Sequence, residues 1–290
     1  MAARSPTESS DLRGSFKDAM TSATALALGL LLAIVVGGAA VAFPSTPASW
    51  YARILEPALL FAASVLALWV AAMYRGDMRR VFRFLAVFLL LYGLVNTTSL
   101  VDWAAEFLDG NFFRALLAYQ LFSYAFLLLA GVGILRVVEV TRLNAWGWVS
   151  VAGGVALGVA IVAYAAPTFR DVFGDNVEAA FLYLVIRIFD VLVMVMLIPV
   201  VWLYIQNARA KYKESATFAV VAIGVVASLV LAYVYELAKQ EPLADLVAEF
   251  QSGSVLDALY LFGYVLLTVA LIAHRKHQDW SLKQLDRILE

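Results

Sequence analysis

Eight apolar stretches dominate this sequence, and each is about as long as a membrane-spanning helix. They cover approximately residues 22–43, 56–74, 82–101, 112–135, 145–165, 179–205, 216–236 and 255–273. A helix of about 20 apolar residues crosses a hydrocarbon core about 30 Å thick, and in lipid its backbone groups are hydrogen-bonded within the segment. Hydrophobic residues make up 63% of the chain, against roughly 45–50% in soluble domains. The sequence therefore predicts an all-α polytopic membrane protein with eight transmembrane helices.

The segments between these stretches alternate in charge. Sixteen of the 21 Lys and Arg residues lie in the two terminal segments and in three of the seven connections. The other side of the membrane would hold only Arg53, Arg114, Arg170, Arg187 and Lys239. Because Lys and Arg accumulate in cytoplasmic loops, we expect a multi-pass protein of the cell membrane with both termini in the cytoplasm (N-in/C-in).

The two halves of the chain resemble each other. Arg53-Ile54-Leu55-Glu56 recurs as Arg187-Ile188-Phe189-Asp190, and Ala105-Glu106-Phe107 recurs as Ala248-Glu249-Phe250. Four helices are an even number, so both copies enter the membrane in the same direction and form parallel repeats. The predicted organisation is a cytoplasmic N-terminal segment (1–21), repeat 1 with helices 1–4 (22–138), repeat 2 with helices 5–8 (139–274) and a cytoplasmic amphipathic tail (275–290).

Two ion pairs are expected within the repeated segments. Arg53 and Glu56, like Arg187 and Asp190, are three residues apart, a spacing that places both side chains on one helix face. Asp190 precedes Arg209 by 19 residues, or about 28 Å of helix, which predicts that the pair lies near the outer membrane interface. Two interpretations stay open: structural ion pairs that fix where the helices emerge, or ligand-contacting pairs around a pseudo-twofold axis.

Polar residues inside the predicted spans concentrate in their outer halves, whereas the inner halves are almost purely apolar. Polar groups in a membrane are costly and are candidates for function, although tyrosines also form interfacial belts and hydroxyls link helices. We predict an outward-facing, Tyr-rich pocket. Its candidate ligand-binding residues are Asn96, Thr97, Asp102, Tyr119, Gln120, Tyr124, Tyr233, Glu236, Asp257, Tyr260 and Tyr264.

Several kinds of chemistry are not expected. The chain has no Cys, and its two His residues, His274 and His277, follow the last predicted helix, so neither a metal nor a haem is expected in the bundle. Nucleotide-binding and hydrolase motifs are absent from the sequence. The spacing of Gly154 and Gly158 is typical of close helix packing, within the chain or between two copies. We expect a protein without catalytic residues, cofactors or nucleic-acid partners.

These observations favour a non-enzymatic sensor or receptor-like module, or a subunit of a membrane complex, with an outward-facing polar pocket. The alternative is a small-solute transporter that works by movement of the two repeats. The expected partners are the lipid bilayer and either another membrane protein or a second copy of the chain as a homodimer.

Overall fold

The computed structural model describes residues 47–108, 111–137, 143–173 and 177–208, together with positions 261, 263–265, 267–272, 274–276 and 279. This described part of the chain is all-helical. Its elements are α2 (Pro47–Ala71), α3 (Gly76–Val95), α4 (Thr98–Leu108), α5 (Phe112–Val137), α6 (Ala145–Phe173) and α7 (Val177–Ala208). The described positions between 261 and 279 are helical as well, and they are called the 261–279 segment below.

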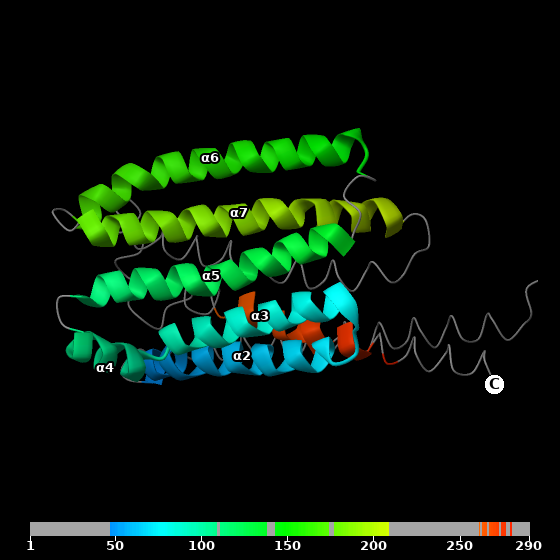
Figure 1. Cartoon of the computed structure of the whole chain (residues 1–290). Coiled ribbons are helices and arrows are strands. Elements are labelled where there is room, and N and C mark those ends of the chain that lie inside the picture. Colours follow the sequence, from blue (N-terminus) through cyan, green and yellow to red (C-terminus); the bar gives the residue numbers. More distant parts are fainter. Residues whose placement is uncertain are drawn as a thin grey trace, which may run out of the picture.

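The long helices lie side by side in an order that differs from their order in the chain (Figure 1). Across the bundle, α2 packs on α3, α3 on α5, α5 on α7, and α7 on α6. The 261–279 segment lies beside α2 and α3 (Figure 1). Residues about 200 positions apart in the sequence are therefore neighbours at that side of the bundle.

Three of the described helices are long and apolar enough to cross a membrane: Ile54–Ala71, Arg114–Val137 and Ala180–Trp202. The residues of α6 include a shorter apolar stretch, Ala145–Ala160. The predicted spans 22–43 and 216–236 lie outside the described residues. The number of spans, the repeat and the domain boundaries therefore stay predictions.

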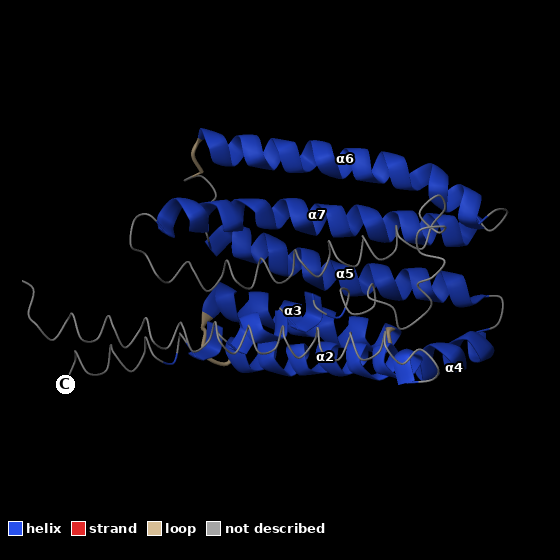
Figure 2. Ribbon diagram, turned by 180° about the vertical axis from the view of Figure 1, so that it is seen from behind, coloured by secondary structure: helices blue, strands red, loops and turns tan. Residues whose placement is uncertain are grey.

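The prediction of a continuous helix over 82–101 is wrong, because α3 ends at Val95 and a separate helix begins at Thr98. The Asn96 side-chain amide donates to the carbonyl oxygen of Tyr92 at 3.0 Å, and the Thr97 hydroxyl donates to that of Gly93 at 2.9 Å. Side chains that bond nearby backbone in this way compete with helix continuation. The next helix, α4, lies beyond the beginning of α2 and beside the beginning of α5 (Figure 2).

A tight turn joins α2 to α3. The amide N–H of Tyr74 donates to the carbonyl oxygen of Ala71 at 3.2 Å, and α3 starts at Gly76 with φ 62°. Only glycine adopts this left-handed conformation without strain. Because the turn is short, α2 and α3 run antiparallel, and the hydroxyl of Ser64 on α2 donates to the carbonyl oxygen of Ala86 on α3 at 2.7 Å.

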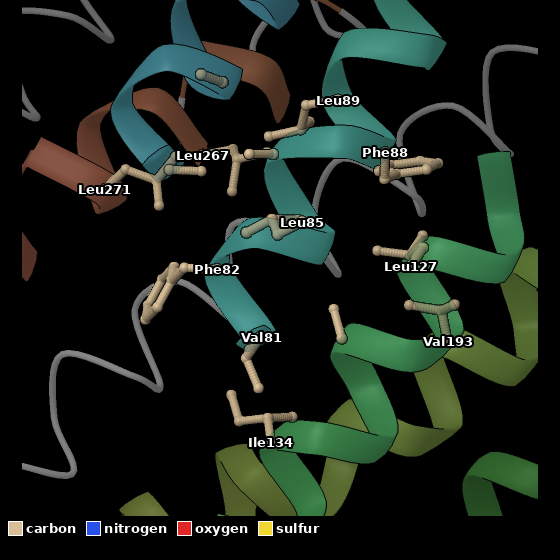
Figure 3. Packing of buried hydrophobic residues seen from close by; sticks show 14 of the residues in the cluster. Val81, Phe82, Leu85, Phe88, Leu89, Leu127, Ile134, Val193, Leu267 and Leu271 are labelled. Atoms are coloured by element: carbon tan, nitrogen blue, oxygen red, sulfur yellow. The ribbon is translucent and has the colours of Figure 1, made fainter. Parts of the chain in front are cut away.

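The apolar core is centred on α3, which has buried side chains on both of its packed sides (Figure 3). Phe82, Leu85 and Leu89 lie between two groups of residues, with Leu267 and Leu271 on one side and α5 on the other. Close approach of the helices depends on small residues: a Cβ added at Gly93 of α3 would lie 2.8 Å from the ring of Phe61.

Candidate functional site

A buried carboxylate links α5 to α7. Asp190 is 1% exposed, and both of its oxygens are hydrogen-bonded. Tyr124 Oη on α5 donates to Asp190 Oδ1 at 2.6 Å, and Arg187 Nη1, one turn earlier on α7, donates to Asp190 Oδ2 at 2.8 Å. The cation of Arg187 is 7% exposed. The structure thus joins a residue predicted for the pocket to the predicted ion pair in one polar cluster, called the Tyr124–Asp190–Arg187 cluster.

The prediction that the Arg187–Asp190 pair lies near the outer membrane interface stays a prediction, because residue positions along α7 do not fix a depth in the membrane. Asp190 is the fourteenth of the 32 residues of α7 and lies near the middle of the apolar span Ala180–Trp202. At about 1.5 Å per residue, α7 is much longer than the hydrocarbon core, so counting residues back from Arg209 does not fix the depth. Within the protein, the pair is buried and contacts α5 through Tyr124.

Aromatic rings enclose the phenol of Tyr124. Its ring lies edge-on to Phe88 at 5.5 Å and to Tyr92 at 6.4 Å between centroids, and it is tilted against Phe189 at 5.9 Å. Phe88 and Tyr92 belong to α3, and Phe189 belongs to α7. Such ring contacts hold Tyr124 in one orientation, so its hydroxyl is directed at Asp190 from a rigid junction of three helices.

Three other polar residues of α5 lie near Tyr124 along the helix and differ in their hydrogen bonds. The Tyr119 hydroxyl donates to the carbonyl oxygen of Leu91 on α3 at 2.8 Å. The Ser123 hydroxyl donates to the carbonyl oxygen of Gln120 at 2.8 Å, within α5. Gln120 is 8% exposed, and its buried Oε1 has no hydrogen-bond partner among the described residues. One turn before Tyr124, α5 therefore presents a buried acceptor that none of the described residues satisfies.

Three predicted pocket residues lie elsewhere. Asn96 and Thr97 bond to carbonyl oxygens of their own helix at the end of α3. Asp102 is exposed on α4. The structure explains the first two as residues at the end of α3. Of the helix-three and helix-four set, Tyr124 belongs to the buried cluster, and Tyr119 and Gln120 lie four to five residues before it on α5.

The second half of the predicted set is largely outside the described residues. This holds for Tyr233, Glu236, Asp257 and Tyr260. Tyr264 is described and is 5% exposed, as part of the apolar core. Glu56 is half-buried on α2, and the side chain of Arg53 lies outside the described set.

An exposed ion pair joins the same two helices at their first turns. Arg114 of α5 donates to Glu178 of α7 through Nη2 at 2.6 Å and through Nε at 3.0 Å. The guanidinium of Arg114 lowers the pKa of the Glu178 carboxyl, first by its hydrogen bonds and also by its charge. The pair lies at the first turns of two parallel helices, with Tyr124 and Asp190 ten and twelve residues farther along.

The prediction that His274 lies in the cytoplasmic tail after the last helix is wrong. His274 is helical and fully buried, and its Nε2 lies 2.7 Å from the hydroxyl of Tyr74. The ring also packs on Phe82, with 5.3 Å between centroids. The signal was present in the sequence: Leu267, Leu271 and His274 are spaced as one face of a helix, and that face is buried against α2 and α3.

The side chains of the Tyr124–Asp190–Arg187 cluster can change hydrogen-bond partners while they stay buried between the helices. Asp190 is an acceptor shared by α5 and α7, and a competing donor or a proton would release one of the two contacts. No family model matches this chain, and the comparisons with curated proteins and with solved structures gave no match either.

Proposed function

We propose that this chain is a non-enzymatic multi-pass membrane protein that acts as a sensor or receptor-like module, or as a subunit of a membrane complex. In this proposal it has eight spans in two parallel four-helix repeats, with both termini in the cytoplasm. The observation that carries the proposal is the hydrogen bond of 2.6 Å between Tyr124 and Asp190, which connects α5 to α7 in the middle of two apolar spans.

Energetics favour a functional role for this cluster over a purely structural one. Replacing a buried ion pair by well-packed apolar residues is often neutral or stabilising, whereas removal of one partner costs about 3–5 kcal/mol. The Arg187–Asp190 pair is therefore not needed for packing strength. A shared acceptor between two helices is instead suited to a contact that a ligand can make or break, because a competing donor changes how α5 is held on α7.

The topology can be tested with single cysteines, since the chain has none of its own. Asp77→Cys lies in the first turn of α3 and Asn111→Cys just before α5, and both positions are exposed. We expect a membrane-impermeant maleimide to label the second variant on intact cells and the first only after the membrane is opened. Labelling of both from the same side would contradict the proposed orientation.

The outward-facing pocket is tested by a small cationic thiol reagent added to sealed vesicles. Gln120→Cys replaces the buried side chain whose acceptor is unsatisfied, and Leu127→Cys is a buried control two turns farther along α5. A ligand-accessible site predicts that the first variant reacts from the outside and that the second is inert. A Gln120→Cys variant that never reacts would remove the pocket.

Cysteines at buried positions farther along α5 distinguish the sensor from the transporter, which is the alternative function. A carrier exposes its site to both sides of the membrane in turn, so Leu127→Cys or Ala130→Cys would react from the cytoplasmic side in one state. A sensor leaves both unreactive from that side. A complex subunit differs again, because a second membrane protein would co-purify in a fixed ratio after extraction in mild detergent.

A further inference from the structure

Three arginines follow one another along the exposed face of α3. Arg75 directly precedes the helix, and Arg79 and Arg83 follow at intervals of four. Arg79 and Arg83, four residues apart within α3, lie one above the other on the helix, whereas Arg75 is the extended residue just before it. The same face continues to Leu90, which is 45% exposed. The row therefore lies on the side of α3 that is directed away from the packed core, and it is called the arginine row below.

The arginine row lacks acidic partners within the part of the chain that the structure describes. The neighbouring Arg80 pairs with Asp77 at 3.2 Å, and Arg275 pairs with Asp279 at 3.3 Å. Ion pairs of this kind are found for none of the three members of the row among the described residues. Among the described residues, three neighbouring positive charges at the beginning of α3 thus have no ion-pair partner.

Neighbouring residues indicate the level of this face in a bilayer. Trp69, near the end of α2, is 45% exposed. The guanidinium of Arg275 lies over the ring of Trp69, 4.6 Å from its centre, and donates to the carbonyl oxygen of Trp69 at 2.7 Å. Exposed Trp next to basic residues is typical of the interface between hydrocarbon and headgroups. Since Trp69 and Arg75 flank the α2–α3 turn, the start of the arginine row lies at headgroup level.

Arg83 lies seven residues into α3, or about 10 Å along its axis. On a lipid-facing side it can reach the headgroups only by extending along the helix. A guanidinium donates two parallel hydrogen bonds to a phosphate, with higher directionality than an ammonium. The chemistry that complements the arginine row is therefore a phosphate group at the membrane surface.

We propose that the arginine row of α3 is a binding site for the headgroup phosphate of anionic phospholipids on the basic side of the membrane. Arg79 and Arg83 hold the phosphate, and Arg75 adds charge at the turn. The site is separate from the Tyr124–Asp190–Arg187 cluster. It depends on α3 being embedded in the bilayer and does not depend on what the protein senses or transports.

The test is native mass spectrometry of the full-length chain in detergent, titrated with phosphatidylglycerol or phosphatidylcholine. The wild type should retain the anionic lipid at lower concentrations than the neutral one. Since each basic residue near an anionic surface contributes about 1 kcal/mol, the double variant Arg79→Gln/Arg83→Gln should bind phosphatidylglycerol about 10- to 30-fold more weakly. Arg79→Lys/Arg83→Lys should fall between the two, because it keeps the charge without the paired donors.

The matched control is Arg80→Gln/Arg136→Gln, which removes the same charge from two other exposed arginines, one paired with Asp77 and one at the end of α5. It should lose less affinity for phosphatidylglycerol than Arg79→Gln/Arg83→Gln, because Arg80 is already paired with Asp77 and Arg136 lies on another helix. Equal loss in both double variants would overturn the site, as would equal binding of the two lipids by the wild type. An unchanged unfolding temperature of the Arg79→Gln/Arg83→Gln variant shows that lost binding is not lost folding.

Discussion

The two sides of α7 differ in the buried middle of their contacts, although glycines and hydrogen bonds occur on both sides. Toward α5, the contact contains the hydrogen-bonded Tyr124–Asp190–Arg187 cluster. Toward α6, the middle of the contact is made by shape, because Cβ atoms added at Gly154 and Gly158 would collide with the side chains of Ile198 and Val191, and one hydrogen bond, from Trp202 Nε1 to Asn144 Oδ1 at 2.9 Å, lies where α6 begins. In lipid there is no hydrophobic drive between helices, so association depends on close packing and on interhelical hydrogen bonds. One helix uses both.

The difference shows what each contact can do. The glycine contact has one favourable geometry, because a fitted surface loses its attraction when it is displaced. The polar contact has alternatives, because donors and acceptors can be exchanged. We therefore expect α6 and α7 to move as a unit and α5 to be the helix whose position relative to α7 changes. Four predictions test this comparison, from the largest effect to the smallest.

Asp190→Ala should be the most damaging change, because it leaves the cation of Arg187 buried without its carboxylate. We expect a loss of about 3–5 kcal/mol in the free energy of unfolding, measured by denaturation in detergent. The double variant Arg187→Met/Asp190→Leu should recover most of this loss, since it removes both charges. A double variant as unstable as the single one would show that charge burial is not the cause.

Gly154→Leu should separate α6 from α7. The added side chain meets Ile198 and Val195, and overpacking of this kind costs about 1–3 kcal/mol. The adjacent Gly153→Leu is the matched control, because a Cβ at Gly153 has no heavy atom within 4 Å. The same unfolding assay should show a lower midpoint for the first variant only. Equal effects would mean that α6 packs differently.

Tyr124→Phe keeps the aromatic packing and removes the hydroxyl that donates to Asp190. Interhelical hydrogen bonds in membranes contribute about 1 kcal/mol, so we expect a modest decrease in the unfolding midpoint. Thiol-reactivity of Gln120→Cys should rise in the Tyr124→Phe background if α5 becomes looser on α7. Tyr119→Phe, which loses a bond to α3 instead, should leave that reactivity unchanged.

The exposed pair Arg114–Glu178 should give the smallest effect, and it should depend on pH. In the folded protein, the pKa of Glu178 lies below the ordinary value of 4.5. Its contribution is therefore complete above pH 4.5 and is lost as the pH falls through the lowered pKa. The unfolding midpoints of the wild type and Glu178→Gln should differ slightly at neutral pH and converge in acid. A constant difference would exclude ionisation as its origin.

Particular residues show how far sequence reasoning reaches. The helices around 56–74, 112–135, 145–165 and 179–205 correspond to α2, α5, α6 and α7 because apolar length is a local property of the sequence. The break after Val95 was missed, since Asn96 and Thr97 read equally well as pocket residues. Their actual role depends on which carbonyl oxygen each side chain reaches, and hydropathy carries no information about this choice.

The candidate site was likewise predictable only in part. Composition and spacing identified Arg187, Asp190 and Tyr124 as residues that need an explanation, because ionised and polar groups within apolar stretches are costly wherever the chain folds. Their contact spans 66 residues and follows from α5 lying between α3 and α7, which no periodicity reveals.

By itself, the sequence determined that the described chain is helical and which of its stretches are apolar enough to span a bilayer. Both follow from local chemistry, namely backbone hydrogen bonding and side-chain transfer into lipid. Only the tertiary structure decided that α5 lies against α7, that Asp190 is shared between them and that His274 is buried beside Tyr74. These depend on which helix faces meet, and in an apolar medium many faces are alike until a few polar groups and glycines select the pairing.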